Sequence, residues 1–227
     1  MRYLALATDY DGTLASGGTV AEPTWEALHR LKTSGRKLIL VTGRELEELR
    51  SICPNLDLFD RVVAENGGVL YRPATRDQEL LASPPPQEFL QTLRDQGVNP
   101  LDVGRTIVAT FRPYEMIVLQ TIANLGLELQ VIFNKDSVMV LPTGVDKATG
   151  LKAALHELSL SPHNVVAVGD AENDHAFLTM CGCSAAVANA LPMLKIAAEI
   201  ITAGAEGQGV VELIEELLAN DLRRATK

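Results

Sequence analysis

Two carboxylates near the start of the chain, Asp9 and Asp11, have the spacing of a reactive pair rather than of packing residues. They follow the apolar run Tyr3–Ala7, and Gly12 supplies the backbone freedom for a turn directly after them. In a regular strand the two side chains would share one face, and Tyr10 would point away from it. Two acids in one crevice repel each other unless a cation or a shared proton lies between them. The pair is therefore a candidate metal ligand, nucleophile or general acid.

Other polar residues could serve the same chemistry. Thr42 follows an apolar run and offers a hydroxyl, with the Gly43 amide beside it, to phosphate oxygens. Lys147 stands where a helix should begin and offers a point charge for a phosphate. Asp170 and Asp174 follow another apolar run and offer the oxygen ligands that Mg²⁺ prefers. Each of these residues alone could be a cap, a turn residue or a solvated lysine. Their joint occurrence beside the acid pair favours a site.

Composition limits what this site can bind. The 227 residues carry a net charge of −9, which argues against nucleic acid and against an anionic membrane as partners. A phosphorylated small molecule would then need a local cationic site, such as a metal ion with one or two basic residues. No apolar run reaches the length of a membrane span and no signal-peptide pattern is present, so we expect a soluble, cytoplasmic protein. The three cysteines, Cys53, Cys181 and Cys183, are too few for a disulfide scaffold, and we expect the thiols of Cys181 and Cys183 to be buried.

The elements that must position these residues alternate between strand and helix in the first and last thirds of the chain. Apolar runs at 37–41, 61–64 and 164–168 predict strands buried on both faces, and the segments between them predict helices. Such alternation is typical of a doubly wound α/β fold with a mostly parallel sheet. Ligands bind outside the carboxyl ends of the strands in these sheets, which is where the polar residues occur. We assign residues 1–81 and 144–227 to this catalytic core.

The middle of the chain has a different order of elements. Pro84–Pro86 interrupts the chain, and the order helix, strand, helix, strand, strand follows. We therefore predict a small α+β cap domain over residues 82–143, inserted into the core. Polar loop residues such as Arg112, Asn134 and Lys135 could face the leaving group of a substrate or could be solvated surface.

The chain resembles the haloacid dehalogenase superfamily of phosphohydrolases over nearly its whole length. The four segments similar to the motifs of that superfamily are Asp9–Thr13, Val41–Arg44, Lys147 and Gly169–Asp174. An insert between the second and third motifs is similar to the Cof-type branch, which includes sucrose-phosphate, mannosylglycerate-phosphate and archaeal phosphoglycolate phosphatases. The turn Glu65–Gly67 and the segment Val187–Ala190 are also similar to that branch.

The resemblance implies a Mg²⁺-dependent phosphatase that hydrolyses a small phosphate monoester, either a sugar phosphate or a phosphoglycolate-like acid. Asp9 would form an aspartyl-phosphate, and Asp11 would act as general acid and then as general base. The implied metal ligands are Asp9, the backbone carbonyl of Asp11, and Asp170, with Asn173 and Asp174 orienting them. The implied phosphate-binding residues are Gly12, Thr42, Gly43 and Lys147.

Other activities fit the same residues. A phosphotransferase or phosphomutase would pass the phosphoryl group from Asp9 to a sugar hydroxyl instead of water. A regulatory module that binds a phosphorylated metabolite would keep the site without turnover. Asp11 favours phosphate-ester chemistry over dehalogenation, because an alkoxide leaving group needs a proton and a halide does not. A dinucleotide-binding enzyme is excluded, since no Gly-rich turn follows the first strand. The protein could be a monomer or a homodimer.

Overall fold

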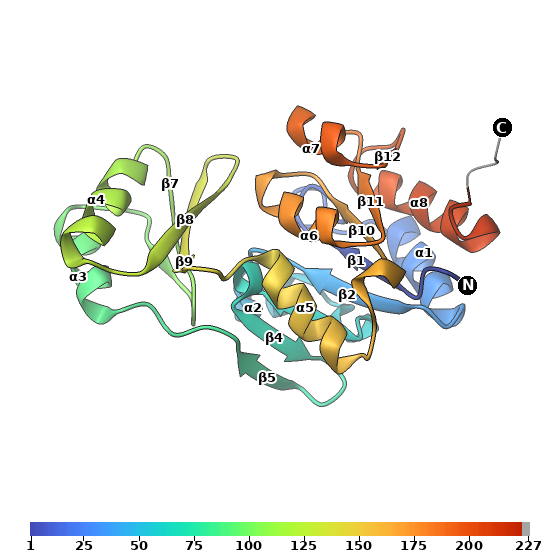
Figure 1. Cartoon of the computed structure of the whole chain (residues 1–227), viewed down its shortest axis with the longest axis horizontal. Coiled ribbons are helices and arrows are strands. Elements are labelled where there is room, and N and C mark those ends of the chain that lie inside the picture. Colours follow the sequence, from blue (N-terminus) through green and yellow to red (C-terminus); the bar gives the residue numbers. More distant parts are fainter. Residues whose placement is uncertain (224–227) are drawn as a thin grey trace.

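A large, mostly parallel β-sheet forms the centre of the molecule (Figure 1). The computed structural model describes residues 1–223. Over this range the larger sheet has eight strands, in the order β12 (Ile200–Ile201), β11 (Cys183–Ala186), β10 (Val165–Gly169), β1 (Ala5–Thr8), β2 (Lys37–Val41), β3 (Arg61–Ala64), β4 (Val69–Arg72) and β5 (Asp77–Leu80). Neighbours from β12 to β3 are parallel, and β4 and β5 continue the sheet antiparallel. The predicted doubly wound α/β fold is confirmed.

Helices cover both faces of this sheet, which is why its central strands are apolar throughout. One face carries α1 (Glu22–Thr33) and α8 (Glu206–Asn220), which pack against each other. The other carries α5 (Lys147–Glu157) and α6 (His175–Met180), which also lie side by side (Figure 1). The side chains of Leu6, Ile39 and Val166 are accordingly inaccessible to solvent. Two short helices, α2 (Leu46–Ile52) and α7 (Pro192–Ala197), complete this part of the chain.

A second, smaller sheet lies beside the first, on the left of Figure 1. Its antiparallel strands run in the order β6 (Asp102–Val103), β7 (Val108–Phe111), β9 (Ser137–Pro142) and β8 (Leu129–Asn134), accompanied by α3 (Gln87–Asp95) and α4 (Glu115–Leu125). Phe89, Val118 and Val138 belong to an apolar cluster separate from that of the larger sheet. We propose that these elements are the insert over residues 82–143, and we refer to them as the cap.

Several short elements differ from the sequence-based expectations. The strands β5 and β6 and the helix α7 were not expected, because segments of two to six residues show little periodicity. The helix that follows β10 begins at His175, after the 3₁₀ turn η4 (Glu172–Asp174). The thiols of Cys181 and Cys183 are buried, as predicted, and the thiol of Cys53 is also buried. Within residues 1–223, no helix has the length and apolarity needed to cross a membrane.

Candidate active site

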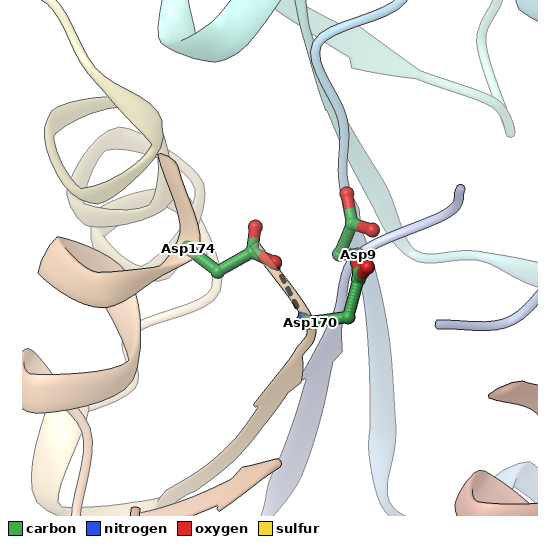
Figure 2. Close-up of side chains that lie close together, drawn as sticks. All are labelled: Asp9, Asp170 and Asp174. Carbon is green, nitrogen blue, oxygen red and sulfur yellow. Dashed lines mark hydrogen bonds between the residues drawn. The ribbon is translucent and has the colours of Figure 1, made fainter. Parts of the chain in front are cut away.

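The carboxyl ends of β1 and β10 bring two aspartates together. The strands pair in parallel with Thr8 beside Val168, so Asp9 and Asp170 emerge at the same edge of the sheet. Asp174 joins them from η4, and its carboxylate accepts a hydrogen bond of 2.8 Å from the Asp170 amide (Figure 2). One carboxylate oxygen from each aspartate lies within 4.8 Å of the others, and all three side chains are buried. We call Asp9, Asp170 and Asp174 the aspartate cluster.

A buried lysine neutralises part of this cluster. The Lys147 Nζ donates hydrogen bonds of 2.6 Å to Asp9 Oδ1 and of 2.6 Å to Asp174 Oδ1. The lysine is only 1 % exposed, so both ion pairs are shielded from water. Its ammonium group also lies 5.8 Å from the ring centre of Phe177. Lys147, the third predicted motif, therefore meets the first and fourth motifs at the same point.

The start of α5 places this lysine. Asp146 caps the helix by accepting a 2.8 Å hydrogen bond from the Thr149 amide, and the Thr149 hydroxyl accepts one of 2.9 Å from the Asp146 amide. One turn into the helix, Gly150 packs directly on the turn that follows β3. A Cβ at Gly150 would lie 2.7 Å from the Gly67 Cα and 2.5 Å from Val63 Cγ1. The absence of a side chain at position 150 is thus what lets the helix approach closely enough for Lys147 to reach Asp9.

The protonation behaviour of the aspartate cluster fits a bound cation. Burial, with the charges of Asp174 and Asp170, raises the pKa of Asp9 to about 8, although Lys147 acts in the opposite direction. Burial also raises the pKa of Asp170. For Lys147, burial lowers the pKa, but the charges of Asp174 and Asp9 outweigh it and the pKa is raised overall. A divalent cation among these oxygens would favour the ionised carboxylates, and an all-oxygen donor set is what a hard cation requires.

Asp11 lies apart from the aspartate cluster. Its carboxylate forms a two-point ion pair with Arg44, at 2.6 Å from Nε to Oδ2 and 2.8 Å from Nη2 to Oδ1. The side chain of Asp11 is 37 % exposed, and Arg44 also pairs with Glu48. Tyr10, between the two acids, is buried on the other side, where its hydroxyl donates to the Gly18 carbonyl at 2.9 Å. Asp11 thus faces the open side of the site, where a leaving group would lie.

The residues predicted to bind phosphate surround the same point. Thr42 is buried at the end of β2, and its hydroxyl accepts a 3.1 Å hydrogen bond from the Arg44 amide. Gly12, with a φ of 77°, is so close to the aspartate cluster that a Cβ there would lie 2.6 Å from Asp170 Oδ2. The Gly12 amide donates to the Ala15 carbonyl at 2.9 Å. Their role in phosphate binding stays a prediction.

Asn173 connects the fourth motif to the turn that follows β3. Its side-chain amide donates a 3.0 Å hydrogen bond to Asn66 Oδ1. The side-chain oxygen of Asn173, Oδ1, is buried and accepts no hydrogen bond from any of residues 1–223. It remains available for a water or a ligand beside the aspartate cluster. The orienting role that the resemblance implies for Asn173 stays a prediction.

A cavity of about 690 Å³ opens above Asp9, between core and cap. The core contributes Asp9, Asp11, Gly43 and Arg44 to its lining, and the cap contributes Ile107, Ala109, Phe111, Asn134 and Lys135. Thr42, Lys147, Asp170, Asp174 and Asn173 lie below this surface. The volume is in the range of small-molecule sites.

The cap also delivers a cation to the site. Lys135 stands in the turn between β8 and β9, and its Nζ donates to Asp170 Oδ2 at 2.8 Å. The Lys135 amide donates to Glu172 Oε2 at 3.1 Å. From the sequence, Lys135 could have faced the leaving group or been solvated surface, and Arg44 had no assigned role. The only sequence features that pointed to these two residues were the place of Lys135 in a short cap hairpin and the place of Arg44 within the second motif.

The chain is similar in sequence to known hydrolases. The family model of the haloacid dehalogenase-like hydrolases matches residues 6–103 and 131–214. Phosphoglycolate phosphatase 2 of Saccharolobus solfataricus is 28% identical, and the match covers 96% of this chain and 94% of that protein. Phosphoglycolate phosphatase of Haloarcula marismortui is 30% identical, with 92% and 95% covered.

Solved structures show the same fold. A haloacid dehalogenase-like hydrolase from Bacteroides thetaiotaomicron superposes with a TM-score of 0.82 at 20% identity, covering 95% of this chain and 99% of that one. The family model accounts for most of the described core and part of the cap, and it includes every predicted motif residue. The chain therefore belongs to the family of haloacid dehalogenase-like hydrolases.

Proposed function

We propose that this protein is a Mg²⁺-dependent phosphatase that hydrolyses a small phosphate monoester through an aspartyl-phosphate on Asp9. The observation that carries the proposal is the aspartate cluster with its buried Lys147, of which Asp9 lines the cavity. Phosphoryl transfer needs an oxygen nucleophile, cationic neutralisation and exclusion of water, and these residues provide all three. Family membership supports the same reaction class.

In the first step, a carboxylate oxygen of Asp9 would bond to phosphorus as the bond from phosphorus to the ester oxygen breaks. Lys147 holds the Asp9 carboxylate in place and brings positive charge next to the transferring group. Thr42 and the Gly43 amide would donate to its oxygens. Mg²⁺, when bound by Asp9, Asp170 and the Asp11 carbonyl, would neutralise charge on the phosphoryl oxygens.

Asp11 would handle the protons of both steps. It would first donate a proton to the departing ester oxygen, which then leaves as an alcohol. The resulting Asp11 carboxylate would take a proton from water as the water oxygen attacks the aspartyl-phosphate. Inorganic phosphate is released, and both aspartates return to their starting forms.

The substrate we favour is phosphoglycolate or a sugar phosphate of similar size. Two relatives matched over more than nine-tenths of this chain are named phosphoglycolate phosphatases. The cavity is large enough for either ligand, and its cap side offers Lys135 and Asn134 as polar partners.

A screen of phosphorylated metabolites tests the proposal. Purified protein with Mg²⁺ should release inorganic phosphate from phosphoglycolate or a small sugar phosphate, and EDTA should stop the release. Product and free phosphate should be followed together, because transfer to a second sugar would identify a phosphotransferase or phosphomutase instead. Failure to hydrolyse any member of a broad panel would favour a regulatory module that binds but does not turn over.

Replacing Asp11 with Asn should affect substrates in proportion to the basicity of their leaving groups. For alkyl phosphates we expect kcat/KM to fall roughly 10²–10⁴-fold, the usual contribution of a general acid. Acetyl phosphate and p-nitrophenyl phosphate should be affected far less, since their leaving groups depart without a proton. The comparison uses kcat/KM because it reports the steps up to the aspartyl-phosphate. Equal losses on both classes of substrate would contradict the acid role.

Replacing Lys135 with Ala should strengthen Mg²⁺ binding in the absence of substrate. The Lys135 ammonium contacts Asp170, so it competes with a metal ion for that carboxylate. It is also 51 % exposed, which limits the effect to roughly three- to tenfold in Kd. Isothermal titration calorimetry measures it, with Lys152→Ala as the control because Lys152 is an exposed lysine on α5. Unchanged or weaker binding in Lys135→Ala would show that the two cations do not compete.

A further inference from the structure

A single core carboxylate holds the turn between β6 and β7 of the cap. Glu65, directly after β3, is 1 % exposed. Its Oε2 accepts hydrogen bonds from the Thr106 amide at 2.7 Å, the Thr106 hydroxyl at 2.8 Å and the Ile107 amide at 3.2 Å. Its Oε1 accepts a fourth from the Arg105 amide at 3.1 Å. The carboxylate thus accepts the hydrogen bonds of three backbone amides in the turn.

Close packing on both sides fixes this contact. A Cβ at Gly68 would lie 1.9 Å from the Thr106 hydroxyl oxygen, and a Cβ at Gly104 would lie 2.9 Å from Glu65 Cδ. The backbone of Glu65 has a φ of 50°, an uncommon conformation for a residue with a long side chain. Because of this packing, the Glu65 side chain has no room for a second arrangement as long as the cap stays in place.

The turn that contains Glu65 and Asn66 is also hydrogen-bonded to the segment that follows β2. The Glu65 amide donates to the Arg44 carbonyl at 2.9 Å, and the Asn66 amide donates to the Thr42 carbonyl at 2.9 Å. Asn66 also accepts from Asn173. The residue that holds the cap is therefore one hydrogen bond from the arginine that holds Asp11.

A second contact between a cap turn and the site, made by Lys135, is weaker. Lys135 reaches Asp170 and Glu172 through two hydrogen bonds, and its side chain is half exposed. A buried carboxylate with four donors resists separation far more than an exposed ion pair does. If the cap moves to admit substrate, the Glu65 contact is the fixed point and the Lys135 contact is the one that opens.

We propose that Glu65 is a positioning residue that sets where the cap wall of the cavity stands. The turn it holds leads directly into β7, and Ile107, Ala109 and Phe111 of that segment line the cavity. Glu65 touches no reacting atom in this proposal, which rests on the proposed phosphatase function. Loosening its contact should weaken recognition of the leaving group and leave phosphoryl transfer largely intact.

Glu65→Gln is the informative variant, because the amide keeps one oxygen acceptor but places an NH₂ group against donors. We expect amide hydrogen exchange at Arg105, Thr106 and Ile107 to accelerate about tenfold or more. We expect KM for the best substrate of the screen to rise about tenfold, with kcat on acetyl phosphate changed by less than about threefold. The matched control is Glu157→Gln, since Glu157 accepts hydrogen bonds from Arg61 and Arg72 within the core.

The exchange measurement separates this proposal from the proposed function, because it needs no turnover. Unchanged exchange at the three amides in Glu65→Gln would overturn the anchoring role, even in an active phosphatase. Equal losses of kcat on all substrates would overturn the positioning role. If Glu65→Gln does not fold, Thr106→Val removes one donor from the cap side and should produce the same pattern at smaller size.

Discussion

Replacing Asp9 with Asn is expected to reduce phosphate release by a factor of about 10⁴ or more, while the protein remains folded. Asparagine has nearly the same shape as aspartate but cannot form the acyl-phosphate bond. Lys147 keeps its 2.6 Å ion pair with Asp174, so its charge does not become unpaired. Burial raises the pKa of Asp9, which favours its neutral form. We therefore expect the neutral asparagine side chain to be tolerated at this position. Phosphate release with Mg²⁺, together with circular dichroism, measures both parts of the prediction.

Asp77→Asn is the matched control, because Asp77 is exposed on the edge strand β5 and should tolerate the same chemical change. Mass spectrometry after an acid quench should detect a phosphoryl group on the unmodified protein and none on Asp9→Asn. Substantial turnover by purified Asp9→Asn would show that Asp9 is not the nucleophile.

Replacing Lys147 with Ala should abolish activity and also destabilise the fold by about 3–5 kcal/mol, the usual effect of removing one partner from a buried ion pair. The loss leaves Asp9 and Asp174 buried without their common cation. A bound divalent cation would replace part of that charge, so the stability deficit should be larger in EDTA than in Mg²⁺. Urea unfolding under both conditions gives the two free energies.

Lys152→Ala serves as the control for this substitution. Lys152 is exposed on the same helix, so its removal should change the free energy of unfolding by no more than about 0.5 kcal/mol. A Lys147→Ala protein as stable as this control, with or without metal, would mean that the aspartates do not depend on the lysine.

The sequence predicts the core well because local patterns and a general rule act together. Apolar runs identify β1, β2, β3 and β10, and the carboxyl ends of parallel strands must meet at one edge of the sheet. That rule places Asp9 and Asp170 at the same edge of the sheet, and the pairing of β1 with β10 in the structure makes them neighbours. Lys147 could be placed only by combining the expected start of a helix with the resemblance to a known family.

The contacts across the cavity could not be predicted in the same way. The pairing of Arg44 with Asp11 and the contact of Lys135 with Asp170 join segments whose spacing follows no helix or strand period. They depend on how the cap sits against the core, which side-chain packing determines. Glu65 illustrates the difference, because its turn was noted from the sequence while its four cap donors become visible only in three dimensions.

The contact of Gly150 with Gly67 has an evolutionary implication. With less than a methyl group of space between helix and turn, the helix that carries Lys147 can neither slide nor rotate without disturbing the hydrogen bonds of Lys147 to Asp9 and Asp174. Both positions therefore require glycine. New substrate preferences must therefore arise through the cap, where the walls of the cavity can change while its floor is inherited intact.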